Sequence, residues 1–393
     1  MDLRIDMSKE YGVVLEGGGA KGAYQIGVLR ALKELDINIK AVVGTSVGAL
    51  NGVLVAQDNL DKAVELWQNI RYSQVINVED DILERITKLD FKDLDFKKIF
   101  NKIIQVIMDR GVDVTPLKKM IAEVVDEEKV RNSDIEFGLV TISLSDRKPL
   151  ELFIEDIEEG RLNDFLLASS YLPVFKNEKL HGTRYLDGGF YNNSPMSMLV
   201  DRGYKNLIVI KIKGIGFDKK SNMEDINVFE IAPSENLGGI LEFDTNKANY
   251  NLNLGYYDAI RRIKGLRGRH YYIDTDKEEE YFISTLIQMD SENKAKYCKV
   301  NNLKNKSVNR AILEDVIPRL AKKLGIRDKW DYCDFIIELL EYFGKKLKVE
   351  RFRIYTFEQF FTLIKNRLRR TRLEIEADER MFKNLLEELA LIS

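Results

Sequence analysis

The sequence predicts an α/β fold, because segments typical of buried strands alternate with helical patterns in its first half. Residues 11–15 and 41–43 have the short apolar pattern of buried strands. Residues 23–35, between them, carry apolar side chains at helical spacing. A strand, a helix and a second strand in so few residues indicate a parallel pair joined by a right-handed crossover. We therefore expect an α/β core.

Further elements follow the same reasoning. We expect helices over 60–131, one of which starts at Thr115-Pro116, and a further helix at 162–168. We expect strands at 136–143, 150–154 and 183–186, and a last core strand at 206–213. After Gly214 we expect a polar loop at 218–225, a long helix at 237–264, a strand at 269–274 and an almost wholly helical region from 278. Because 393 residues exceed what one core usually holds, we predict a catalytic domain at 8–213, a connecting segment at 214–276 and a helical region of unknown role at 277–393.

Composition limits the classes of protein to consider. The chain is 45% hydrophobic and 32% charged, as folded proteins are, and its net charge of −3 gives no electrostatic case for binding nucleic acid. Cys298 and Cys333 lie too far apart to suggest a disulfide framework or a zinc site. The first ten residues lack the apolar stretch of a secretory signal, and no apolar run approaches the roughly 18–20 residues of a spanning helix. We expect a cytoplasmic protein with reduced thiols.

Ser46 stands at a turn between the second strand and a helix of small residues. Gly44 and Gly48 flank it in a Gly-x-Ser-x-Gly pattern, which in this setting is typical of a nucleophile elbow. The strained turn leaves little room for side chains at either flanking position. The following helix directs its N-terminal N–H groups towards the serine.

A glycine loop, residues 17–22, follows the first strand and precedes a helix. Its Gly-x-Gly-x-x-Gly spacing matches a dinucleotide fingerprint. However, the second strand runs into Gly44 without the acidic residue that would hold a ribose, and no Gly-Lys-Ser/Thr of a P-loop is present. The alternative is an oxyanion hole, since consecutive glycines can turn their N–H groups towards one point.

A serine nucleophile needs a base, and the chain has two histidines. His181 stands in a polar loop, which favours a solvated residue. His270 follows in the chain order Ser, Asp, His that α/β-hydrolases use, but it has no glycine elbow around it. Asp187 ends a strand before Gly188 and Gly189, so it is either a base in a Ser–Asp dyad, with its pKa raised by an apolar pocket, or a turn residue that caps its own backbone.

Four stretches in this order resemble the patatin-like phospholipase family. They are Gly17–Gly22, Gly44–Gly48, the Ser-Ser-Tyr-Leu-Pro loop at 169–173, and Asp187-Gly188-Gly189, followed by Asn192-Asn193-Ser194-Pro195. The resemblance covers about residues 11–213. It implies a three-layer α/β/α fold with a mainly parallel sheet, and lipid acyl hydrolase activity without metal or cofactor.

The resemblance also implies roles for single residues. Ser46 would be the nucleophile and Asp187 the base, and the backbone of Gly17, Gly18 and Gly19 would form the oxyanion hole. Lys21 takes the family's basic position, where it would steady the loop or attract a phosphate. The remaining motif glycines would support these turns: Gly22, Gly44, Gly48, Gly188 and Gly189. Glu16 and Ser194 depart from the commonest pattern, but neither is part of the dyad.

The expected partner is a lipid or phospholipid substrate. For the expected cytoplasmic protein, the inner face of a membrane is one location at which it would meet this substrate. An apolar stripe with lysines at 96–107 would be a lipid-facing lid or, alternatively, a core-facing helix. Basic clusters at 261–269 and 365–372 would bind anionic lipid or form solvated, acid-paired helix faces. The alternatives to an enzyme are a lipid- or nucleotide-binding module and, for the helical region, a regulatory or oligomerisation role.

Overall fold

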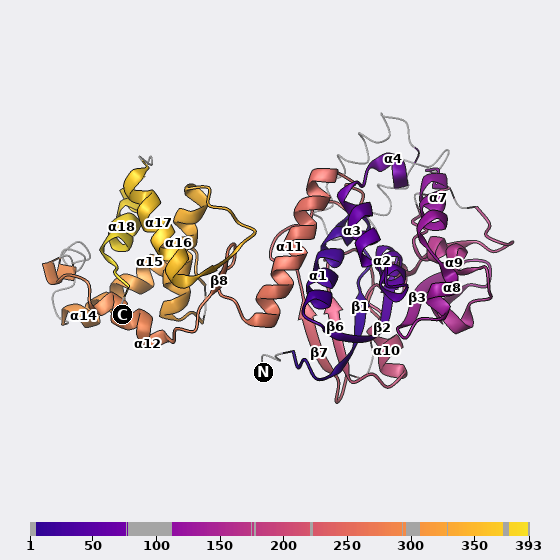
Figure 1. Ribbon diagram of the computed structural model, residues 1–393, viewed down its shortest axis with the longest axis horizontal. Helices are drawn as coiled ribbons and strands as arrows, with labels where there is room; N and C mark the ends of the chain where they lie inside the picture. The colour runs from indigo at the N-terminus through magenta and orange to yellow at the C-terminus, as the bar shows by residue number, and fades with distance from the viewer. Residues whose placement is uncertain are drawn as a thin grey trace. The chain divides into compact units, whose positions relative to one another are not determined.

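The computed structural model describes residues 5–75, 77, 112–173, 175–176, 178–220, 223–292, 294–295, 307–327, 329–371 and 377–391. These residues form two compact units, Met1–Ile263 and Lys264–Ser393 (Figure 1). The first unit contains every residue that the sequence places in the catalytic site.

A seven-stranded sheet is the centre of the first unit. Its strands lie in the order β4, β3, β2, β1, β6, β7, and β5 pairs with β3. They span Glu10–Leu15 (β1), Asn38–Thr45 (β2), Glu136–Ser143 (β3), Lys148–Phe153 (β4), Tyr185–Asp187 (β5), Asn206–Ile210 (β6) and Asn227–Ile231 (β7). Only β4 and β5 run antiparallel to their neighbour, so the predicted α/β core with a mainly parallel sheet is confirmed.

Helices cover both faces of this sheet (Figure 1). Neighbouring residues of a strand point to opposite faces: Val42 faces Gly52 of α2, whereas Val43 packs in a cluster with Leu199 of α10. The helices among the described residues of this unit are α1 (Gly22–Glu34), α2 (Val47–Ala56), α3 (Leu60–Gln68), α4 (Tyr72–Val75), α7 (Thr115–Val124), α8 (Glu127–Arg131), α9 (Leu162–Ser169), α10 (Met196–Asp201) and α11 (Thr245–Lys264). The chain therefore has the three-layer α/β/α arrangement.

Two expectations for residues 214–264 need correction. Strand β7 was not predicted, because only Phe229 and Ile231 of its five residues are buried and the pattern is short. Helix α11 begins at Thr245 rather than at residue 237, since Gly238 has a φ of +94° that a helix does not accommodate. Both elements belong to the first compact unit, so its core continues past Gly214.

The second unit is mainly helical around its own apolar core. Its described helices are α12 (Glu279–Ile287), α14 (Val308–Ala311), a π-helical turn (Ile312–Val316), α15 (Ile317–Lys323), α16 (Tyr332–Lys346), α17 (Phe357–Arg370) and α18 (Ala377–Glu388). The expected strand at 269–274 is shorter, β8 at Tyr272–Asp274, and it pairs with an unpredicted strand, β9 at Ile354–Thr356.

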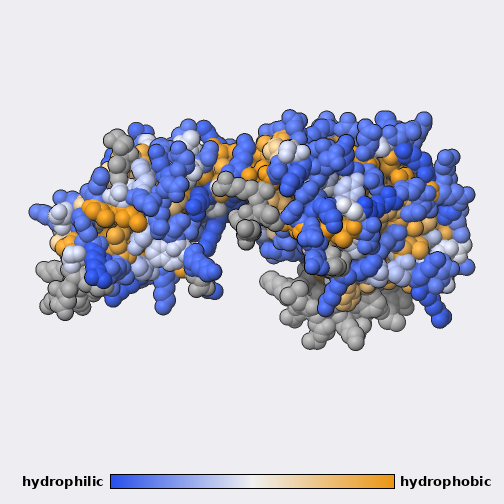
Figure 2. All heavy atoms as spheres, turned by 90° about the horizontal axis from the view of Figure 1, so that it is seen from below, coloured by the Kyte–Doolittle hydropathy of each residue, from blue (hydrophilic) through white to orange (hydrophobic). Residues whose placement is uncertain are grey.

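The described surface is largely hydrophilic on the face drawn in Figure 2, with small separate hydrophobic areas. Among the described helices, none combines the length and the apolar character needed to cross a bilayer.

Candidate active site

Ser46 occupies a sharp turn between β2, which ends at Thr45, and α2, which begins at Val47. Its φ of 55° and ψ of −124° lie outside the regions that side chains readily adopt. A Cβ atom on Gly44 would lie 2.3 Å from the carbonyl carbon of Gly48, and one on Gly48 would lie 2.2 Å from the carbonyl oxygen of Leu15. The turn therefore depends on both glycines, and it leaves Ser46 with 8% of its surface exposed.

Asp187 is brought to this turn by the register of the sheet. Strand β4 covers one edge of β3, so β2 and β5 share the other edge. The last residue of β2, Thr45, pairs with Val140, and Asp187 of β5 pairs with the next residue, Thr141. Asp187 thus lies directly beyond the end of β2, where Ser46 begins the turn.

Burial raises the pKa of the Asp187 carboxyl from 3.8 to about 6, and the nearby Ser46 hydroxyl and Gly189 N–H lower it in part. The N–H of Gly189 donates to Oδ1 at 2.8 Å. Atom Oδ2 is buried and has no hydrogen bond of normal geometry among the described residues. Asp187 therefore caps its own turn with one oxygen and keeps the other available. The two interpretations of the sequence are compatible.

The glycine loop is pinned at Gly17. The Gly17 N–H donates to the carbonyl oxygen of Asn193 at 3.0 Å, and Asn193 Nδ2 donates to the carbonyl oxygen of Gly17 at 3.2 Å. The Gly17 N–H is thus committed and is not free to bind an oxyanion. Within the described part of the chain, the N–H groups of Gly18 and Gly19 have no acceptor.

Gly19 lines the same cavity as Ser46. Its φ is +57°, and a Cβ atom there would lie 2.0 Å from the carbonyl oxygen of Ile240. This position therefore requires glycine both for its backbone conformation and for its space. The N-termini of the short helix Gly19–Lys21 and of α1 follow at once, so the loop has the positive potential of a helix start.

Lys21 and Glu16 hold the two ends of this loop. The Lys21 ammonium donates to the carbonyl oxygen of Lys213 at 2.6 Å, and burial lowers its pKa. Burial raises the pKa of Glu16, whose carboxylate accepts the N–H of Ile212. Of the two roles considered for Lys21, the bond to Lys213 corresponds to the one that steadies the loop.

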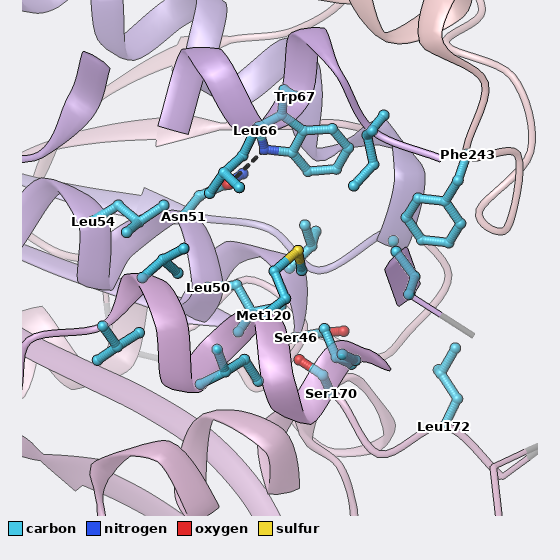
Figure 3. Close-up of a pocket in the computed structure, with 18 of the residues that line it drawn as sticks. Ser46, Leu50, Asn51, Leu54, Leu66, Trp67, Met120, Ser170, Leu172 and Phe243 are labelled. Atoms are coloured by element: carbon cyan, nitrogen blue, oxygen red, sulfur yellow. Dashed lines mark hydrogen bonds between the residues drawn. The ribbon is translucent and has the colours of Figure 1, made fainter. Parts of the chain in front are cut away.

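A cavity opens beside Ser46 and is lined mostly by apolar side chains (Figure 3). They include Leu50, Leu54, Trp67, Met120, Leu172 and Phe243. Leu54 lies eight residues beyond Ser46 along α2, about 12 Å at 1.5 Å per residue. The cavity therefore runs from the serine along this helix.

Within the first unit, whose one histidine is His181, no histidine lines the cavity beside Ser46. His181 Nε2 lies 2.8 Å from Asp164 Oδ2, and its side chain is largely exposed, as the sequence predicts. His270 belongs to the second compact unit, where its backbone N–H donates to Glu341 at 2.9 Å. The carboxyl group that contacts Ser46 is that of Asp187.

Ser169 and Asn193 have structural roles that the sequence did not reveal. The Ser46 N–H donates to Ser169 Oγ at 2.9 Å, and that hydroxyl donates to the carbonyl oxygen of Val140 at 2.7 Å. Ser169 thereby links the turn to β3, while Asn193 holds Gly17. The only sign of these roles in the sequence was that both residues lie within recognised motifs. Their hydrogen-bond partners are distant in sequence, so the contacts could not be predicted.

Several of the predicted cations are paired with acids. Arg261 contacts Asp258 at 2.7 Å, Arg267 contacts Asp334 at 3.2 Å and Arg269 contacts Glu338 at 3.7 Å. The stripe at 96–107 and Arg372 lie outside the described residues. Among the described residues, no group of three or more His, Cys, Asp or Glu side chains could hold a metal ion.

The first unit is thus an α/β fold in which Ser46, at a sharp strand–helix turn, lies beside the buried Asp187. Residues 13–200 match the family model described as patatin-like phospholipase. These residues therefore form a patatin-like phospholipase domain.

Three comparisons illustrate the relationship. Patatin-like phospholipase domain-containing protein 7 of Rattus norvegicus is 23% identical over 215 residues, which is 53% of this chain and 14% of that protein. Lysophospholipase nte1 of Aspergillus terreus is 52% identical over 50 residues, 13% of this chain and 3% of that protein. The chain thus matches only a small part of these relatives. The crystal structure of VipD from Legionella pneumophila aligns with 96% of this chain and 85% of that chain, at 13% identity and a TM-score of 0.38.

Proposed function

We propose that the protein hydrolyses fatty acyl esters of lipids or phospholipids through a Ser46–Asp187 dyad. One observation carries the proposal: a serine in a strained turn lies beside a buried carboxyl group with a pKa of about 6 and lines an apolar cavity. A carboxylate with this pKa is mostly ionised at neutral pH and is basic enough to accept a proton during attack.

The mechanism follows from the positions of these groups. Asp187 accepts the hydroxyl proton of Ser46 as Oγ attacks the ester carbonyl, and the resulting oxyanion accepts the N–H groups of Gly18 and Gly19. Asp187 then returns the proton to the leaving alcohol, which gives an acyl-serine. Water, deprotonated by Asp187, attacks this acyl group and releases the fatty acid and Ser46.

The apolar lining of the cavity favours a fatty acyl chain as the part of the substrate that is bound next to the ester carbonyl. Its walls offer little but aliphatic and aromatic carbon along α2 beyond Ser46, so a polar acyl group would lose its hydration without replacement. The names of the relatives, a phospholipase domain protein and a lysophospholipase, support a glycerophospholipid substrate. A cytoplasmic location at a membrane surface would suit this substrate.

The experiment is release of fatty acid from phosphatidylcholine and lysophosphatidylcholine vesicles by the purified full chain. Ser46→Ala and Asp187→Asn should each reduce the rate by at least about a thousandfold, as losses of nucleophile or base do in other serine hydrolases. Asp201→Asn, at an exposed carboxylate of the same unit, is the matched control and should keep full activity. Hydrolysis that survives in Asp187→Asn but disappears in His270→Ala would contradict the dyad.

A further inference from the structure

Ser170 has a buried hydroxyl that no group of the described residues binds. The residue is 6% exposed, and its Oγ atom has no hydrogen-bond partner among the described residues. Ser170 lines the same cavity as Ser46, and Figure 3 draws both serines in the same part of its wall. A buried hydroxyl without a hydrogen-bond partner destabilises the folded state, so the position suits a ligand group that accepts its hydrogen bond.

The neighbours of Ser170 in the chain contact both members of the proposed dyad. Ser169 Oγ accepts the backbone N–H of Ser46 at 2.9 Å. The carbonyl oxygen of Tyr171 accepts the backbone N–H of Asp187 at 2.9 Å. Ser170 is therefore held between residues that contact the serine and the aspartate, in the part of the cavity wall where the ester must react.

The other polar side chain of the cavity wall is already satisfied. Asn51 donates to the carbonyl oxygen of Gly22 and to Gln25, and its Oδ1 accepts the indole N–H of Trp67 at 2.9 Å. The Gly19 N–H is assigned to the oxyanion. Among the described side chains that line the cavity, apart from Ser46 itself, Ser170 is thus the one whose hydroxyl group still lacks a hydrogen-bond partner.

We propose that the Ser170 hydroxyl donates a hydrogen bond to the alkoxy oxygen of the scissile ester, a role that rests on the proposed function. As the bond between Ser46 Oγ and the acyl carbon forms and the bond from that carbon to the alkoxy oxygen breaks, Asp187 delivers the Ser46 proton to the departing oxygen. The hydrogen bond from Ser170 stabilises the charge that develops there. In deacylation the attacking water takes the same place, and Ser170 orients it while Asp187 takes its proton.

The test compares Ser170→Ala on two substrates that differ in one atom type. Dioctanoyl phosphatidylcholine has oxygen leaving groups, and its dithioester analogue has sulfur, which is a weak hydrogen-bond acceptor. In acylation-limited kcat/KM, we expect a loss of about five- to tenfold on the oxyester and less than about twofold on the thioester. The melting temperature should stay equal or rise, because the variant removes an unpaired buried hydroxyl.

Ser194→Ala is the matched control. Ser194 is 1% exposed, its Oγ atom also lacks a partner among the described residues, and it does not line the cavity. It should retain both activities within about twofold. Equal losses on the two substrates in Ser170→Ala, or a profile identical to Ser194→Ala, would overturn the role of Ser170. Failure of the wild-type protein to hydrolyse either substrate would instead overturn the proposed function.

Discussion

Replacing Asp187 by asparagine should abolish hydrolysis and yet stabilise the fold at neutral pH. The carboxylate is buried, and one of its oxygens lacks a hydrogen bond among the described residues. Asparagine has nearly the same shape, keeps an oxygen that can accept the Gly189 N–H, and has no charge to desolvate. The proposed base Asp187 would thus lower the stability of the folded state.

The magnitude follows from the pKa of Asp187. Folding raises it from 3.8 to about 6, and each unit corresponds to about 1.4 kcal/mol. Because the folded state binds the proton more tightly, the stabilising effect of protonation is complete below pH 3.8 and disappears as the pH rises through about 6. At pH 7 the wild-type protein therefore carries a cost of about 3 kcal/mol that Asp187→Asn removes. At pH 4 or below the difference should largely vanish.

The assay is thermal unfolding of the wild-type protein and Asp187→Asn at pH 4 and pH 7, followed on the transition of the first unit. At pH 7 we expect the melting temperature to rise by roughly 6–12 °C, and at pH 4 by little. The control variant Asp201→Asn changes an exposed carboxylate and should show no such pH-dependent gain. Equal stability of the wild-type protein and Asp187→Asn at pH 7 would refute the argument that burial sets this pKa.

Three further outcomes are expected. In the wild-type protein, kcat/KM should fall about tenfold for each pH unit below about 6 and level off above it, because Asp187 must be ionised to act as base; a rate independent of pH between 5 and 7 would contradict this role. Leu54→Trp should slow release of palmitate at least about tenfold more than release of butyrate, since the larger ring fills the cavity away from Ser46; equal effects would mean that the acyl chain lies elsewhere. Asn193→Ala should lower kcat by about 10- to 100-fold with little change in KM, because Gly17 loses the amide that fixes the oxyanion loop; a change confined to KM would exclude this positioning role.

Much of this site could be predicted from the sequence because its parts are local. The turn at Ser46 needs Gly44 and Gly48, and the structure gives the steric reason for each. The parallel pair β1 and β2 follows from apolar segments separated by one helix.

The parts that could not be predicted depend on contacts between distant segments. Asp187 lies beside Ser46 because β5 pairs with β3 directly after the last residue of β3 that pairs with β2. Residue patterns do not encode this register. The commitment of the Gly17 N–H to Asn193, 176 residues away, changes which glycines can serve an oxyanion. Strand β7 was missed because it is short and only two of its five residues are buried.

The central claim is that Ser46 is activated by Asp187. Labelling with a fluorophosphonate, followed by intact mass and peptide mapping, tests it most directly, because only an activated serine reacts quickly. We predict one adduct, on Ser46, with a rate that rises through about pH 6 and is lost in Asp187→Asn. An adduct on another serine, or an unchanged labelling rate in Asp187→Asn, would contradict the account.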